Sequence, residues 1–227
     1  MQHSNSLNFQ LRQLAKDCLP ESWFEARRVR KAQTWYRSAK VAFIHVPKSA
    51  GTSVSRSIYG EQVGHFTLER MIRNSQQDVL DLPRFAIVRN PWDRAVSAYH
   101  FARDGGSPGG GWMEHPERYR TEEFRNFDSF VHQYLATRDV RTLSIIFRPQ
   151  CYYLSLGDGT TPLDHVGYLD RLTQTEDWLT RTLGRVVKFG QSNRTEHKDY
   201  RDYYDRDTRR VIAKVYGEDI EKFGFRF

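Results

Sequence analysis

Short apolar runs separated by polar turns divide the chain into alternating strand and helix segments. The runs at 41–46, 85–88 and 165–169 are rich in β-branched and aromatic residues, which is typical of buried strands. The first two are each followed at once by a segment predicted to be helical. Strand–turn–helix units in succession predict an α/β fold with three layers, in which helices flank a parallel sheet on both faces.

Capping signals predict where the helices begin and end. Ser22 and Glu25 have the spacing of a capping box, and Asn90 followed by Pro91 predicts an N-cap and a first helical residue. Further signals follow along the chain. Gly60 is expected to end the first crossover helix, Asp128 to cap a helix through Leu135, Thr173 and Glu176 to form a second capping box, and Gly217 to close the last helix.

The length and the loop composition predict one domain over residues 1–227. A chain of 227 residues buries enough surface for one core, and no linker interrupts the pattern. Residues 1–20 are polar and are expected to form a loose N-terminal arm. Residues 104–118 hold five glycines and two prolines, so we expect a flexible loop without regular structure.

Composition excludes several classes of protein. No window approaches the roughly 20 apolar residues of a membrane span, and the polar start lacks the layout of a secretory signal. Cys18 and Cys151 are the only cysteines, too few for a disulfide framework. A cytoplasmic protein without a membrane span is therefore expected.

The net charge of +7 predicts anionic partners, and the proportion of arginine to lysine indicates which class of anion is favoured. Of 35 basic residues 8 are lysine and 27 are arginine. Guanidinium groups bind phosphate, sulfate and carboxylate through two points, so discrete oxyanions are favoured over a diffuse surface charge.

The segment 47–53 predicts a phosphate-binding loop between a strand and a helix. A turn of small residues points successive backbone N–H groups at one place, and the helix N-terminus adds partial positive charge. Lys48 supplies a full charge. The expected ligands of the anion are Lys48, Ser49, Ala50, Gly51, Thr52 and Ser53. A plain strand-to-helix turn that needs Gly51 for its backbone is the alternative.

The loop differs from that of nucleotide kinases. Lys48 precedes Gly51, whereas the kinase loop places its lysine after a second glycine, and the second strand ends in Arg89 rather than an acid. No metal site is expected. An ATP-dependent small-molecule kinase stays open as an alternative, as does a basic nucleic-acid module, although the arginines are scattered and no nucleic-acid partner is expected.

Two motifs together resemble a known family. PKSAGTS after FIHV, followed by FAIVRNPWDRAVSAY, is similar to the two signature motifs of the sulfotransferases that use 3′-phosphoadenosine-5′-phosphosulfate (PAPS), in particular the carbohydrate-type branch and its bacterial relatives. The resemblance extends over about residues 40–227. It implies that the first motif binds the 5′-phosphosulfate of PAPS and that the second, through Arg89 and Ser97, binds its 3′-phosphate. Arg89 in a surface ion pair is the alternative, and Arg94 and Arg103 are expected to be solvated.

The resemblance also implies the chemistry. Lys48 would stabilise the negative charge that builds on the leaving 5′-phosphate, and a base would remove the proton of the acceptor hydroxyl. Related enzymes carry a histidine or glutamate in the segment that here contains His65, which makes His65 the first candidate. The substitutes are His100, Glu61, Glu69 and, in the glycine-rich loop, His115.

The acceptor side is the least defined. Gln150 and Asn193 resemble family positions near the cleft, Asn193 on the PAPS side, with loop-capping amides as the alternative reading. His100 and Trp112 are further candidates for contact with a small-molecule or glycan acceptor. The sequence indicates neither the acceptor nor the oligomeric state.

Overall fold

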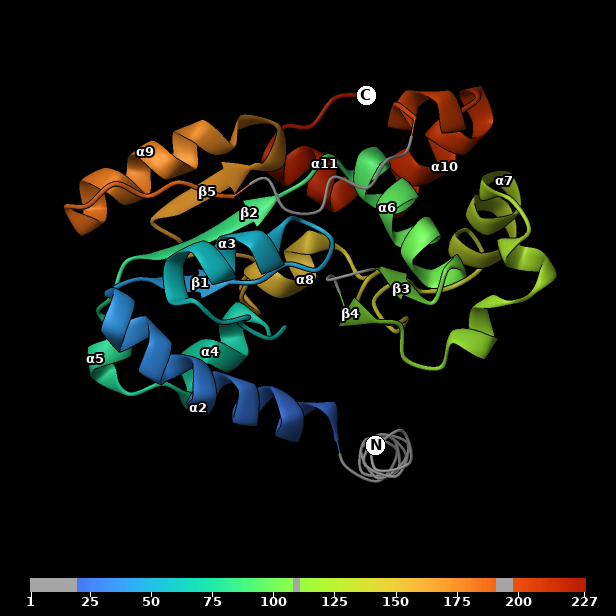
Figure 1. The fold of residues 1–227 in the computed structure, drawn as a ribbon. Helices are drawn as coiled ribbons and strands as arrows, with labels where there is room; N and C mark the ends of the chain where they lie inside the picture. Colours follow the sequence, from blue (N-terminus) through green and yellow to red (C-terminus); the bar gives the residue numbers. More distant parts are fainter. Residues whose placement is uncertain (1–19, 108–110, 191–197) are drawn as a thin grey trace, which may run out of the picture.

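The computed structural model describes residues 20–107, 111–190 and 198–227. Its centre is a parallel sheet of three strands in the order β1-β2-β5 (Figure 1). The strands span Ala42–Ile44, Arg84–Val88 and His165–Tyr168. Phe43 lies opposite Phe85, so the first two strands end side by side. The predicted parallel sheet is confirmed.

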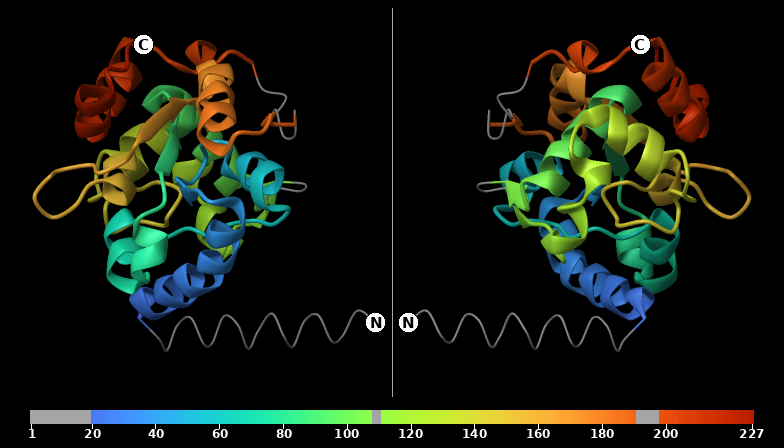
Figure 2. Two further views of the ribbon diagram at one scale, coloured as in Figure 1. Left: turned by 90° about the vertical axis from the view of Figure 1, so that its left-hand side faces the viewer. Right: turned by 90° about the vertical axis from the view of Figure 1, so that its right-hand side faces the viewer.

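Alternate residues of β1 and β2 face different helical layers. Ala42 and Ile44 belong to one buried cluster, which includes residues of α2 (Glu21–Ala39), α4 (Leu68–Asn74) and α8 (Gln150–Leu154). Phe43 and Phe85 belong to another, with residues of α3 (Gly51–Tyr59) and α9 (Leu172–Leu183). Because both faces are covered, β1 and the last four residues of β2 are apolar and buried, and the three predicted layers are confirmed (Figures 1 and 2).

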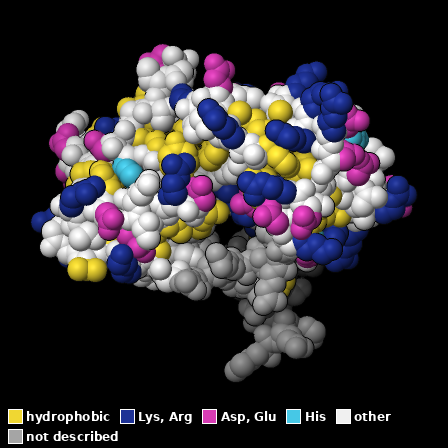
Figure 3. All heavy atoms as spheres, turned by 90° about the horizontal axis from the view of Figure 1, so that it is seen from above, with side chains coloured by type: hydrophobic (Ala, Val, Ile, Leu, Met, Phe, Trp, Pro, Cys, Tyr) yellow, Lys and Arg dark blue, Asp and Glu magenta, His cyan; other side chains and the backbone are white. Residues whose placement is uncertain are grey.

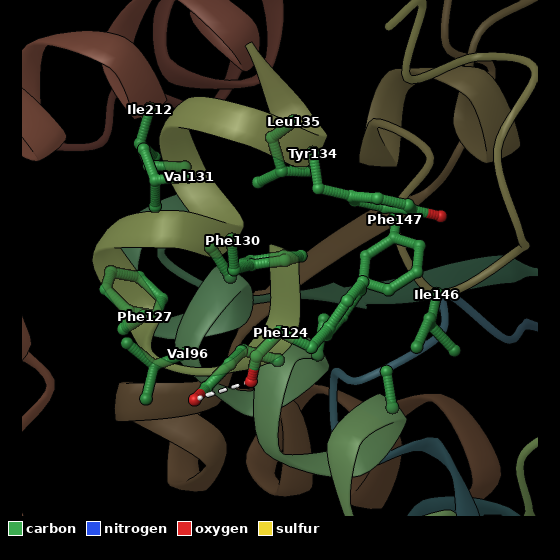
Figure 4. Close-up of a cluster of buried hydrophobic side chains, with 14 of the residues drawn as sticks. Val96, Phe124, Phe127, Phe130, Val131, Tyr134, Leu135, Ile146, Phe147 and Ile212 are labelled. Atoms are coloured by element: carbon green, nitrogen blue, oxygen red, sulfur yellow. Dashed lines mark hydrogen bonds between the residues drawn. The ribbon is translucent and has the colours of Figure 1, made fainter. Parts of the chain in front are cut away.

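A third buried cluster lies beside the sheet and is rich in aromatic residues (Figure 4). It joins α6 (Pro91–Arg103) and α10 (Arg206–Val215) to the segment between residues 113 and 147. The ring centroid of Phe130 lies 5.2 Å from that of Phe124 and 5.6 Å from that of Phe147, which are distances typical of packed aromatic pairs. This cluster fixes α6 against the end of the sheet.

The remaining elements are short, apart from α11. They are α5 (Gln77–Leu80), the 3₁₀ helices η1 (Pro116–Tyr119), η2 (Glu122–Phe124), η4 (Leu169–Arg171) and η5 (Tyr200–Tyr203), α7 (Phe127–Ser129), the π-helical η3 (Phe130–Leu135) and α11 (Gly217–Phe223). No helix in the described ranges is long and apolar enough to cross a bilayer. The assignment of residues 1–227 to one domain stays a prediction, and the expected arm lies almost wholly outside the described residues.

Two predicted helix boundaries are confirmed at the ends that matter for the site. Gly60 ends α3 in the left-handed conformation, with φ 71°. The side chain of Asn90 accepts a hydrogen bond from the N–H of Trp92 at 3.1 Å, and Pro91 is the first residue of α6. Helix α6 therefore begins directly after β2.

Three predicted caps are wrong. Helix α2 begins at Glu21 after Pro20, so Ser22 lies inside its first turn and caps nothing. Glu176, far from capping α9, accepts a hydrogen bond from the N–H of Phe189 at 2.6 Å. Asn126, not Asp128, caps α7. Side-chain spacing alone does not fix a cap, because tertiary contacts can engage the same polar groups elsewhere.

Two further expectations need correction. Gly217 does not close the last helix, since α10 ends at Val215 and Gly217 is the first residue of α11. The segment 104–118 has regular structure at both ends of its glycine run, because β3 (Gly106–Ser107) and β4 (Gly111–Trp112) pair as an antiparallel hairpin. Gly106 is required there, since a Cβ would lie 2.6 Å from the carbonyl oxygen of Gly111.

Candidate functional site

The backbone between β1 and α3 turns through two left-handed residues. Lys48 has φ 66° and Ala50 has φ 58°, although neither is glycine. Left-handed residues placed this way make consecutive N–H groups converge, and the first turn of α3 adds N–H groups without helical acceptors. Thr52 is half-buried in that turn, and Ser53 is buried. The loop thus has backbone angles typical of anion-binding turns.

The loop rests on the ring of His45, which continues the chain after β1. A Cβ at Gly51 would lie 1.8 Å from Cδ2 of His45, so only glycine allows this close approach. His45 is itself buried, and its Nδ1–H donates to the carbonyl of Val63 at 2.6 Å. Burial lowers the pKa of His45 to about 4, so the ring is neutral.

Lys48 directs its ammonium toward α6. Its Nζ lies 3.8 Å from the ring centroid of Phe101. Burial, and after it the charges of Arg89 and Arg94, lowers the pKa of Lys48 to about 7. A lysine held in this state gains most from an incoming anion, because that anion would reverse the local charge imbalance.

Arg89 lies directly beside the loop. Its Nη1 donates to the carbonyl oxygen of Lys48 at 3.2 Å, so the structure brings together the two cationic residues named from the motifs. The rest of the guanidinium forms a two-point ion pair with Asp93, with both N–O distances 2.7 Å. Ser97 is buried one helical turn beyond Asp93, on the same face of α6.

Gln150 joins the two motifs from beneath. Its side chain is fully buried, accepts from the N–H of Arg89 at 2.8 Å and donates to the carbonyl of Arg89 at 2.9 Å. Its Oε1 also lies 3.4 Å from the hydroxyl of Ser49. Asp219 in turn accepts from the N–H groups of Gln150 and Cys151, both at 2.8 Å. The amide expected near the acceptor is therefore engaged within the chain on both sides.

Arg94 is the residue of this region whose surroundings the sequence did not predict. It was expected in solvent, but its side chain is 2% exposed. Its guanidinium donates to the carbonyls of Pro47, Ile146 and Arg148 at 3.0, 3.3 and 2.7 Å. A signal was present, because α6 is apolar around most of its circumference, and a helix of that kind is covered on all sides. Arg94 ties the residue before Lys48 to the segment that leads into α8.

His65 lies against His45, with ring centroids 4.0 Å apart. Its Nδ1 is 3.0 Å from the carbonyl oxygen of His45, and since a carbonyl only accepts, Nδ1 carries the proton. Nε2 then holds a lone pair. The pKa of His65 lies well below its usual range. Burial is the largest cause and the neighbouring His45 is the second, so the ring is a neutral acceptor.

The other candidate residues are placed less decisively. Nε2 of His100 lies 2.9 Å from the hydroxyl of Tyr203. Trp112 is 86% exposed on β4. Glu61 is exposed after α3, Glu69 pairs with Arg73 on α4, and His115 lies beside Glu117. Asn193 lies outside the described residues. Within the described ranges, no group of three or more His, Cys, Asp or Glu side chains could hold a metal ion.

Comparisons with known proteins identify the family and the fold of the chain. A model of the sulfotransferase family matches residues 35–226. Among solved structures, the chain is similar to mouse sulfotransferase SULT7A1 complexed with PAP, with 14% identity and a TM-score of 0.50 over 85% of this chain and 89% of that one. At this identity the likeness shows the fold. No curated protein matches the chain in sequence.

Proposed function

This chain belongs to the sulfotransferase family, and from that premise we propose that it moves the sulfuryl group of PAPS to a hydroxyl of a carbohydrate or small-metabolite acceptor. The family and the enzyme class expected from the two motifs are confirmed. The donor-binding residues, the base and the acceptor are the proposed part, as is a cytoplasmic location.

One observation supports the donor site above all others. The carbonyl of Lys48 accepts from Arg89, so the first motif and the second meet at the ends of adjacent strands. A nucleotide with phosphates at its 5′ and 3′ positions needs two anion sites close together. The loop at 48–53 suits the 5′ side, and Arg89 with Ser97 suits the 3′ side. Asp93 would then share Arg89 with the 3′-phosphate or release it.

The proposed reaction is an in-line transfer. The acceptor oxygen attacks sulfur, the bond from sulfur to the bridging oxygen breaks, and the electron pair stays on the 5′-phosphate of the product PAP. The ammonium of Lys48 stabilises that developing charge. Nε2 of His65 takes the acceptor proton, which its neutral state and its Nδ1–H bond to His45 favour.

The acceptor class is inferred from one exposed side chain. Trp112 presents an indole to solvent on the hairpin that follows α6. An exposed indole can stack on the apolar face of a sugar ring or on an aromatic alcohol. Both are neutral hydroxyl compounds, consistent with a single proton transfer at the acceptor.

The test is transfer from labelled PAPS to a panel of sugars and phenols, with calorimetric titration of PAP. Lys48→Met should reduce turnover by about 10²- to 10³-fold. Lys40→Met is the matched control, because Lys40 also has a left-handed backbone but is exposed at the end of α2. Equal turnover of the two variants would contradict the role of Lys48. Tight binding of Mg²⁺-ATP without binding of PAP would indicate a kinase instead.

A further inference from the structure

The contact between Lys48 and Phe101 is not explained by donor binding alone. Phe101 stands on α6 one turn after Ser97 and two turns after Asp93, so all three lie on one face of that helix. Its ring is half-buried and packs against the aromatic cluster beside the sheet. The phosphate-loop ammonium thus rests on a fixed aromatic surface 3.8 Å away.

The surroundings of Lys48 otherwise disfavour its charge. The groups that bear on it are Arg89 and Arg94, which repel it, and His65, which is neutral. In the described part of the chain no ion pair involves Lys48, since Asp93 is committed to Arg89. An aromatic face attracts a cation through its quadrupole, and the attraction is largest where water is excluded. Within the described residues, the ring of Phe101 is therefore the one neighbour in the structure that favours the charged form of Lys48.

We propose that Phe101 is a positioning residue for Lys48. The ring of Phe101 holds the ammonium of Lys48 protonated and in place at the phosphate loop before the donor binds. The importance of this role for catalysis rests on the proposed function of Lys48. The contact itself belongs to the ligand-free protein and can be tested there.

The sign of the expected effect follows from which form the ring prefers. Burial lowers the pKa of Lys48, and the ring opposes that effect because it favours the charged form. Leucine at position 101 would keep the apolar surroundings and remove the quadrupole, so Lys48 would lose its proton at lower pH. Tryptophan presents a stronger quadrupole, so Lys48 would keep its proton to higher pH.

The first experiment follows the Cε and Nζ resonances of Lys48 by NMR across pH 5 to 10 without ligand, with Lys48→Met for assignment. We expect the midpoint of Phe101→Leu to fall by about one pH unit below that of the unmodified protein, and that of Phe101→Trp to rise. Trp35→Leu is the matched control, because it removes another lysine–aromatic contact, that of Lys31 at 5.1 Å, on α2. Equal midpoints in all variants would overturn the proposal.

The second experiment measures PAP affinity across the same pH range. At pH 5 Lys48 is protonated in every variant, and we expect affinities within threefold of one another. At pH 8 Phe101→Leu should bind about 3- to 30-fold more weakly than the unmodified protein, and Phe101→Trp should not. A loss of the same size at every pH would mean that Phe101 only packs. If the unmodified protein does not bind PAP, the proposed function fails, while the NMR midpoints still decide the inference.

Discussion

A single absent methyl group decides how closely the phosphate loop approaches the sheet. Gly51 lies against the ring of His45, which is fixed by its hydrogen bond to Val63 and by its contact with the tilted ring of His65. The ring cannot rotate away without breaking that bond. The loop, the buried histidine and the candidate base are therefore in contact one after another.

Gly51→Ala should displace the loop, because its Cβ would collide with His45. We expect a loss of about 1 to 3 kcal/mol in the free energy of unfolding, together with at least tenfold weaker PAP binding. Urea denaturation and calorimetry measure the two quantities. The control is Gly157→Ala, where no atom lies within 4 Å of an added Cβ. Similar behaviour of the two variants would show that the loop tolerates the collision.

Individual residues differed in how well the sequence predicted them. The sequence predicted that Lys48 and Arg89 lie close together, because each follows a strand and neighbouring parallel strands end at the same edge of a sheet. The burial of Arg94 was not predicted, since an arginine in a helix is usually solvated. Its three carbonyl acceptors also belong to segments distant in the sequence. The engagement of Gln150 within the chain depends on contacts of the same long-range kind.

Among the elements, α6 organises the site. One helix supplies the partner of Arg89, the buried Arg94, the buried Ser97 and the ring under Lys48. Its start is fixed by Asn90 and Pro91 immediately after β2. A small rotation of α6 would move all four side chains at once, and the contacts of α6 with the cluster beside the sheet oppose such a rotation.

Arg94→Met should be strongly destabilising, because it leaves the carbonyls of Pro47, Ile146 and Arg148 without their donor. We expect a loss of roughly 2 to 5 kcal/mol in the free energy of unfolding, measured by urea denaturation. Arg103→Met on the same helix is the comparison, since Arg103 is about half exposed and pairs with Asp104. That variant should lose less than about 0.5 kcal/mol. If Arg94→Met lowered the free energy of unfolding no more than Arg103→Met does, the hydrogen bonds of Arg94 would not be needed to hold the loop in place.

Elements were predicted where burial imposes a simple pattern. The strands are covered on both faces, and apolar runs follow from that. Caps were predicted less well, because Ser22, Thr173 and Asp128 satisfy a spacing rule without occupying the end of a helix. The β3-β4 hairpin escaped prediction because its strands are two residues long and consist largely of glycine.

On the face of the molecule drawn in Figure 3, positive charge is spread rather than concentrated. Lys and Arg side chains alternate with Asp and Glu over the face in Figure 3 instead of forming a continuous band. Such a surface does not favour nucleic acid, which needs a basic stripe. The net charge of +7 still produces a field that attracts small anions.

The association rate of PAP should therefore fall several-fold between about 20 mM and 200 mM salt, because ions screen this field. Stopped-flow measurement gives the rate. AMP, which carries fewer negative charges, serves as the control ligand and should show a shallower dependence. An association rate of PAP that does not change with salt would mean that the field of the whole protein plays no part in capture.

The anchoring of Gln150 has a consequence for the order of assembly. Its partners lie 61 residues before it at Arg89, 101 residues before it at Ser49 and 69 residues after it at Asp219. During synthesis, both motifs would leave the ribosome long before Asp219 is available to fix the backbone at Gln150. A nascent chain that ends before α11 would contain both signature motifs and still lack the contact of Asp219 with the backbone of Gln150, so this support for the two motifs forms only after α11 has been synthesised.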